Sequence, residues 1–159
     1  MTANDLIVKM IFDRWSTLLK SFDTTLNVLT DEQLHKEIAP GKNRGIYLLG
    51  HLIAVHDDMI PLLNLGDKQH AGLFEIFVKA PDKSIEAIPS VKELRNLWKN
   101  QMETLVPKLE RISVNEWFEK HSAVSAEDFI AEPHRNKLNI LLTRTTHLSY
   151  HAGQFVLLR

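Results

Sequence analysis

Cysteine is absent from this 159-residue chain. Without cysteine the protein forms no disulfide bond and offers no thiolate to a metal ion. Any metal site must therefore be built from histidine, aspartate or glutamate. If thiol chemistry takes place on this protein, the thiol must arrive as a substrate.

An excess of charge of one sign is missing as well. The formal net charge is −1, and lysine and arginine form no block. This balance argues against a nucleic-acid partner and against an anionic membrane surface. Long apolar runs are also lacking at the N-terminus, where Asp5, Lys9 and Asp13 interrupt the segment, so we expect no signal peptide, no membrane span and a cytoplasmic location. The length suits one hydrophobic core, which predicts a single domain over residues 1–159.

The sequence does contain helical periodicity. Apolar residues recur at spacings of three and four in three long segments, and a fourth segment, residues 45–63, is apolar almost throughout. The stripes are Ile7, Ile11, Trp15, Leu18, Phe22, Leu26 and Leu29; Val91, Leu94, Trp98, Met102, Leu105, Leu109 and Ile112; and Leu138, Leu141, Thr145, Leu148, Ala152 and Phe155. No strand-like alternation competes with these stripes.

Polar residues divide the chain between these segments. Capping boxes begin at Thr30 and Ser90, and a similar start follows at Ser113. Pro107 is expected to kink or end the third long helix. Residues 66–89 have no long period and predict a crossing connection with a short helix near residues 73–78. Four long helices, with this connection between the second and third, predict an all-α four-helix bundle.

His147 and His151 stand four residues apart in the last predicted helix. Residues at this spacing lie on one helix face, so both imidazoles can reach one metal ion. The spacing alone is weak evidence, because a chain with eight histidines often contains such a pair by chance. Taken by itself, the pair is better interpreted as two partly exposed helix residues.

His51 is a third candidate and lies in the apolar sequence YLLGHLIAV of the second long helix. A histidine on a buried face needs a hydrogen-bond partner or a metal. The neighbouring Gly50 weakens a helix by about 1 kcal/mol, which indicates close approach either of a ligand or of a packed side chain. His51, His147 and His151 together would form a three-nitrogen site with open coordination positions.

Other constellations are less convincing. Glu32 and His35 have the Glu-x-x-His spacing of a di-iron bundle, but no second copy exists. Leu148 occupies the position at which a zincin carries its catalytic glutamate. His56 is expected to point elsewhere on its helix. The remaining histidines are interpreted as surface residues, with His121 or His134 alternatively near the site: His35, His70, His121 and His134.

Three parts of the chain together resemble the DinB/YfiT-like family of metalloenzymes. They are LLGHLIAVHDDM, the C-terminal HLSYHAGQFVLLR, and the order in which an amphipathic helix, a TDEQL stretch and Pro-Gly precede the histidine helix. The resemblance covers nearly the whole chain and implies a DinB-like domain with an up-down-down-up bundle. It also implies a divalent metal, zinc or nickel, on three histidines that map onto His51, His147 and His151.

Two further residues match the family's C-terminal segment. We expect Gly153 to allow close packing of helices. Gln154 either supports a metal ligand or, as we favour at this point, is a polar residue at the end of the bundle.

The resemblance implies a function too, since characterised family members transfer or isomerise with low-molecular-weight thiols. A metal with an open position lowers the pKa of a thiol, and a protein without cysteine would take that thiol as a substrate. The leading hypothesis is a metal-dependent thiol S-transferase that acts on a small electrophile, with a homodimer as the expected assembly. The alternatives are a non-catalytic metal-binding or stress-response bundle that acts through partners, and a structural bundle whose histidines only satisfy core polarity.

The sequence assigns no catalytic acid or base. Asp58, two turns beyond His51, is either a base near the site or, as favoured, a solvated acid at the bundle end. Arg144 precedes His147 by three residues. It either receives an anionic group of a substrate or, as favoured, forms a surface salt bridge.

Overall fold

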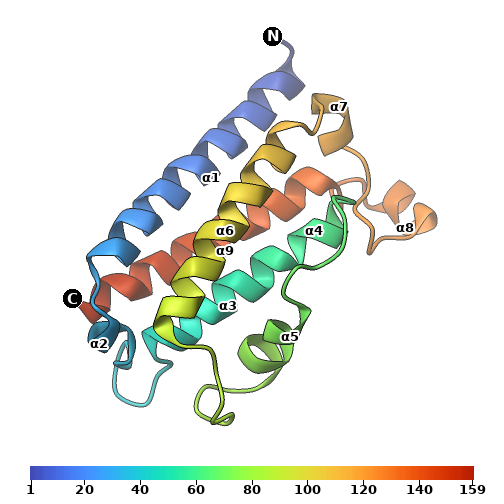
Figure 1. The fold of residues 1–159 in the computed structure, drawn as a ribbon. Coiled ribbons are helices and arrows are strands. Elements are labelled where there is room, and N and C mark those ends of the chain that lie inside the picture. Colours follow the sequence, from blue (N-terminus) through green and yellow to red (C-terminus); the bar gives the residue numbers. More distant parts are fainter.

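Four long helices dominate the computed structural model, which describes residues 1–159 and contains no strand. They are α1 (Ala3–Val28), α3 (Gly45–Asp57), α6 (Val91–Glu110) and α9 (Lys137–Phe155). α1 packs along α9 and α3 packs along α6, while α3 also contacts α9 (Figure 1). The expectation of an all-α protein is confirmed. None of the helices combines the length and the apolar composition that a membrane span requires.

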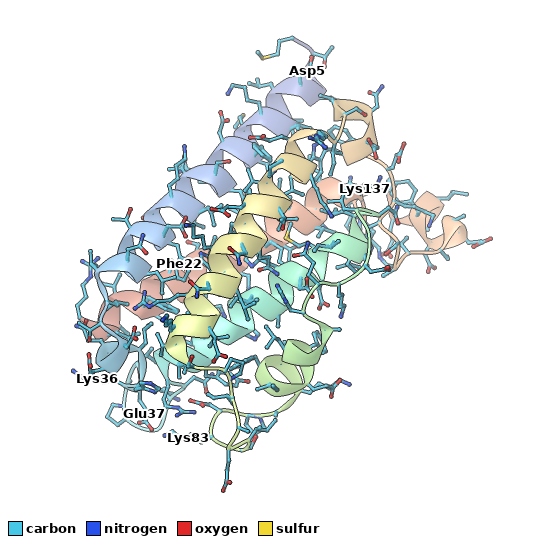
Figure 2. The ribbon with its side chains drawn as sticks, viewed as in Figure 1. Asp5, Phe22, Lys36, Glu37, Lys83 and Lys137 are labelled. Atoms are coloured by element: carbon cyan, nitrogen blue, oxygen red, sulfur yellow. The ribbon has the colours of Figure 1, made fainter.

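One cluster of 32 buried hydrophobic residues joins the long helices. Phe22 of α1, which is labelled in Figure 2, meets the rings of Trp98 and Phe155 edge-on, with centroids 5.2 and 4.9 Å apart. Each such pair adds about 0.5–1.5 kcal/mol beyond the burial of its area. The buried stripe of α1 begins at Val8 and not, as expected, at Ile7, whose side chain is 43% exposed. At 100° per residue Val8 lies about 20° from the direction of Trp15, whereas Ile7 lies about 80° away.

Short helices fill the turns between the long ones. They are α2 (Asp31–Leu34), α7 (Val114–Trp117), α8 (Ala126–Ala131) and a final 3₁₀ turn, η2 (Val156–Leu158). Thr30, Ser90 and Ser113 each cap a helix through a complete capping box, as the sequence predicts. In every box the hydroxyl and the side chain three residues later satisfy backbone N–H groups that the first turn leaves free.

Two prolines affect their helices differently. Pro61 has no N–H for the carbonyl of Asp57, and the expected helix over 45–63 divides there into α3 and α4 (Met59–Leu62). Pro107 lies inside α6, which nevertheless continues to Glu110. Pro107 and Glu103, whose carbonyl loses its partner, both face solvent, so water can replace that hydrogen bond. Of the two expected effects of Pro107, a kink or an end of the helix, the end is therefore wrong.

The crossing connection between α3 and α6 carries α5 (Ala71–Phe74) and a π-helical turn, η1 (Glu75–Lys79). Polar contacts tie it to α3. The guanidinium of Arg44 pairs with the Asp82 carboxylate at 2.6 Å, and the Tyr47 hydroxyl donates to the Ala80 carbonyl at 2.7 Å. At the other end the buried Asp57 carboxylate accepts the backbone N–H groups of residues 69 and 70. η1 is thereby held against the middle of α3, where His51 lies.

Candidate metal centre

The three histidines predicted from the sequence meet in space. His51 comes from α3, and His147 and His151 come from α9. The Nε2 atom of His147 lies 3.2 Å from Nε2 of His51 and 3.0 Å from Nε2 of His151. One nitrogen from each residue lies within 4.8 Å of the others, so the cluster can hold a metal ion. A contact between α3 and α9 thus joins segments 96 residues apart.

A backbone carbonyl determines the tautomer of His51. Its Nδ1 lies 2.8 Å from the Phe77 carbonyl oxygen, which only accepts, so the proton resides on Nδ1 and Nε2 carries a lone pair. The Phe77 carbonyl is available because residue 81, four positions later, is a proline without an N–H. The π-helical turn, with its Ala80 N–H bonded to Glu75, aims this carbonyl at α3. The spacing of Phe77 and Pro81 is a sequence signal for this contact that our sequence analysis missed.

Gln154 performs the same task for His151. Its Oε1 atom lies 2.7 Å from Nδ1 of His151, again leaving Nε2 with a lone pair. The favoured interpretation of Gln154 as a mere polar end residue is therefore wrong, and the hydrogen bond supports the alternative, in which Gln154 orients a candidate ligand. The i to i+3 spacing of His151 and Gln154 on one helix was the available signal.

His147 completes the cluster. Its Nε2 atom faces the lone pairs on Nε2 of His51 and of His151. Its Nδ1 atom is buried and has no hydrogen-bond partner. Its Nε2 atom carries at most one proton and therefore donates to only one of its two neighbours. With the proton on Nδ1, three nitrogen lone pairs converge, an arrangement that repels itself in the absence of a cation.

The donor set fits a divalent metal ion. Histidine nitrogens bind zinc at about 2.0–2.1 Å, which places two ligand nitrogens about 2.9 Å apart at a right angle and about 3.3 Å apart at the tetrahedral angle. The observed separations of 3.0 and 3.2 Å lie within this interval. Hydrogen bonds to the remote nitrogens of His51 and His151 match the usual support of a metal-bound imidazole. Three ligands from the protein leave at least one coordination position open.

Burial keeps the cluster neutral. It is the leading cause that lowers the pKa of all three imidazoles, and it brings that of His147 to about 4, with further lowering from His151, His51 and Arg144. The acceptors at Phe77 and Gln154 act in the opposite direction on their partners. Neutral imidazole is the form that binds metal, so no proton has to leave at pH 7.

Two glycines near the cluster have different roles. A Cβ atom on Gly50 would lie 2.5 Å from the Phe77 ring, so the glycine lets this ring, and the carbonyl beside it, approach α3. The close approach inferred from the sequence is thus that of a packed side chain. Gly153 has no atom within 4 Å of such a Cβ, and the expectation that it allows close helix packing is wrong.

The other histidines stay outside the cluster. His56 is fully buried on α3, and its Nδ1 donates to the Leu52 carbonyl of the same helix at 2.8 Å. His35 and His134 are exposed, while His70 and His121 are half-buried in loops. None of these residues belongs to the group of nitrogens that can hold one ion.

Arg144 and Asp58 depart from their favoured interpretations. Arg144 forms no ion pair and no hydrogen bond within the protein, and its Nε atom is sealed from solvent. The predicted surface salt bridge is therefore absent. Asp58 is largely buried and pairs with Lys68. It is the leading charge that raises the pKa of Arg144, although burial of Arg144 outweighs it and lowers that pKa.

Comparisons with known proteins concern the fold and the family of the chain. No curated protein matches the chain. The crystal structure of a conserved protein from Enterococcus faecalis is similar, with 17% sequence identity, a TM-score of 0.63, and coverage of 98% of this chain and 94% of that one. This likeness concerns the fold alone. The model of the DinB superfamily matches residues 14–155, which include all three histidines, and the chain therefore belongs to the DinB superfamily.

Proposed function

We propose that the protein is a metal-dependent enzyme that transfers a low-molecular-weight thiol to a small electrophile. The observation that carries this proposal is the convergence of three imidazole nitrogens, two of them with their lone pairs directed inward by Phe77 and Gln154. A divalent ion bound there, zinc or nickel, would lower the pKa of a thiol in its open position and make it nucleophilic at neutral pH.

The chain's own residues have two tasks in such a reaction. The neutral histidines would hold the ion without adding charge, so its positive charge would be available to a thiolate. The surrounding apolar core strengthens this attraction by lowering the local dielectric. The thiolate sulfur then forms a bond to the electrophilic carbon, the leaving group departs with the electron pair, and the thiol proton goes to solvent. With no cysteine in the chain, the sulfur belongs to the substrate.

Metal analysis followed by thiol-transfer assays tests this proposal. We expect about one divalent ion per purified chain, and consumption of a glutathione-like or bacillithiol-like thiol in the presence of a small electrophile. The variant His51→Ala is expected to lose both metal and activity, whereas His134→Ala, an exposed loop histidine, retains both. If His51→Ala changes neither metal content nor activity, the proposal is wrong.

A second candidate, a metal-binding protein without catalysis, is favoured by one observation. Five surface pockets, of about 270 to 440 Å³, are lined by other residues and include none of the three histidines. Spectra of the cobalt(II)-substituted protein separate the two candidates. A thiol that reaches the ion produces a new near-ultraviolet band, whereas a closed site shows no change at millimolar thiol.

Two structural features complete the proposal. We propose that α1, α3, α6 and α9 run up, down, down and up in one domain, an arrangement supported by the packing of α1 on α9 and of α3 on α6. We also propose a homodimer, on the family resemblance alone. Sedimentation equilibrium at micromolar protein tests the assembly, and a mass of one chain contradicts it.

A further inference from the structure

Arg144 lies on the same face of α9 as the metal centre. It precedes His147 by three residues and His151 by seven, so at 100° per residue it points within about 60° of the first and 20° of the second. Its positive charge acts on the centre, because it is one cause of the lowered pKa of both His51 and His147. Arg144 therefore lies about one helical turn before His147 and about two turns before His151.

The hydrogen-bonding groups of this guanidinium are not used by the protein. Its Nε atom is buried without a partner, and no hydrogen bond or ion pair of the fold involves its terminal nitrogens. Those terminal nitrogens, unlike Nε, are not sealed from solvent. Arg144 is thus half-buried, and its terminal nitrogens keep some contact with solvent. An unpaired buried donor is costly, and structures rarely retain one without a reason.

The charges around the centre leave Arg144 without a counterion. Asp58 is the one carboxylate among the causes of the shifted Arg144 pKa, and it pairs with Lys68 and forms no ion pair with Arg144. A divalent ion on three neutral imidazoles would add further positive charge to the same region. The region is therefore electrostatically complementary to an anion.

We propose that Arg144 binds a carboxylate group of the small molecule that reacts at the histidine centre. The planar fork of the guanidinium matches the two oxygens of a carboxylate, and the place of Arg144 one turn before His147 separates the bound anionic group from the reacting atom. The inference rests on the proposed function for the identity of that atom, but the anion site itself requires only Arg144. The inference restricts the proposed substrates to small molecules that carry a carboxylate.

The carboxylate can belong either to the thiol or to the electrophile. Two thiols that differ at the distal group, 3-mercaptopropionate and 2-mercaptoethanol, distinguish these sources on cobalt(II)-loaded protein, in which binding of the thiolate is followed by its near-ultraviolet band. If the thiol carries the carboxylate, the wild-type protein binds 3-mercaptopropionate about tenfold more tightly. The variant Arg144→Gln then binds the two thiols equally.

A second measurement needs no thiol. The Nε–H signal of Arg144 in the ¹H–¹⁵N spectrum of zinc-loaded protein is followed during titration with propionate and, separately, with propionamide. We expect propionate to shift this signal and propionamide to leave it unchanged. If the carboxylate belongs to the electrophile, the shift persists when 2-mercaptoethanol saturates the metal, and the two thiols bind with equal affinity.

The outcomes separate this inference from the proposed function. If neither thiol produces a band but propionate still moves the Arg144 signal, the thiol-transfer proposal fails and the anion site stands. If propionate leaves the signal unchanged and the two thiols bind equally to wild type, Arg144 binds no carboxylate, and its side chain merely covers apolar surface with its stem.

Two further variants control for folding and for general charge. Arg144→Lys retains the charge without the fork, so we expect it to keep only part of the preference for 3-mercaptopropionate. Arg111→Gln removes an exposed charge at the end of α6 that is not among the causes of the shifted histidine pKa values. It is expected to behave as wild type. An equal loss of preference in Arg111→Gln contradicts a specific site at Arg144.

Discussion

His51 and His56 lie on the same helix, five residues apart, and burial lowers the pKa of both. Their second nitrogens differ. Nε2 of His51 points at two other imidazoles, whereas Nε2 of His56 is buried without a partner, with its ring edge-on to Trp98 at 5.3 Å. His56 donates to its own helix, and His51 donates across to the crossing connection.

This difference shows that a low pKa alone does not make a histidine a candidate metal ligand. Burial makes both rings neutral, but only His51 has its lone pair directed at others by a contact from a different segment. His51 is a candidate ligand because the free Phe77 carbonyl of η1 binds its Nδ1 atom. His56 has no such contact from another segment and is a core histidine. The following variants are designed to break or sharpen this comparison.

The largest effect is expected from removing a proposed ligand. His147→Ala should weaken binding of zinc by on the order of 100- to 1,000-fold, because structural zinc sites contribute about 10–16 kcal/mol that is shared among four ligands. Competition with a chromophoric chelator measures this affinity. His56→Gln should leave it within about threefold of wild type, since His56 has no place in the cluster. Equal losses of zinc affinity in the two variants would contradict the distinction between a candidate ligand and a core histidine.

Acid should destabilise the fold through His56. Its pKa is lowered from 6.5 to about 3 by burial, so between these values the unfolded chain binds a proton that the native protein excludes. Stability is therefore retained above pH 6.5 and lost as the pH falls. This residue alone should account for about 2 kcal/mol between pH 7.5 and pH 5. Urea unfolding in the presence of chelator, compared between wild type and His56→Gln, measures the difference. If the free energy of unfolding falls equally with pH in the two proteins, the predicted contribution of His56 is wrong.

A smaller effect is expected from the residue that supports His151. Gln154→Ala removes the acceptor for Nδ1 but none of the three ligand nitrogens. Loss of such a supporting hydrogen bond typically weakens metal binding by about 10- to 100-fold, and we expect the lower end because water can reach this half-exposed position. The same chelator competition measures it. Gln154→Glu, which retains an acceptor, should recover most of the affinity.

The smallest effect is expected at Gly50. In Gly50→Ala the new methyl group would meet the Phe77 ring at 2.5 Å, and relieving such a contact costs about 1–3 kcal/mol. The better helix propensity of alanine returns up to about 1 kcal/mol, so thermal unfolding should show a net loss of about 1 kcal/mol. Because Phe77 also holds His51, metal affinity should fall in the same variant. Gly153→Ala, with free space around it, is the matched control.

Much of the helical architecture could be predicted because its signals are local. The stripe from Val91 to Ile112 is buried throughout, and the capping residues Thr30 and Ser90 start their helices as expected. The errors occurred where an effect depends on solvent or on another segment. α6 tolerates Pro107 because this side of the helix is exposed to solvent, and water can bind the carbonyl that loses its partner. Gly153 has no neighbouring atoms that a side chain would meet.

The candidate metal centre, too, could be predicted only in part from the sequence. The spacing of His147 and His151 places them on one face of any helix they form, because each residue advances by 100°. The absence of cysteine likewise restricts the ligands before any fold is known. By itself the sequence therefore determined the four long helical segments, the shared face of the pair and the chemistry of the donors.

Only the tertiary structure decided which nitrogens meet. The 3.2 Å approach of His51 to His147 depends on packing between helices far apart in the chain. The tautomers depend on a carbonyl left free by Pro81 and on a glutamine one turn away. The unpaired state of Arg144 depends on which carboxylates come near it. Helical periodicity is set within a few residues, whereas the direction of a lone pair and the burial of a charge are set by neighbours that the chain brings in from elsewhere.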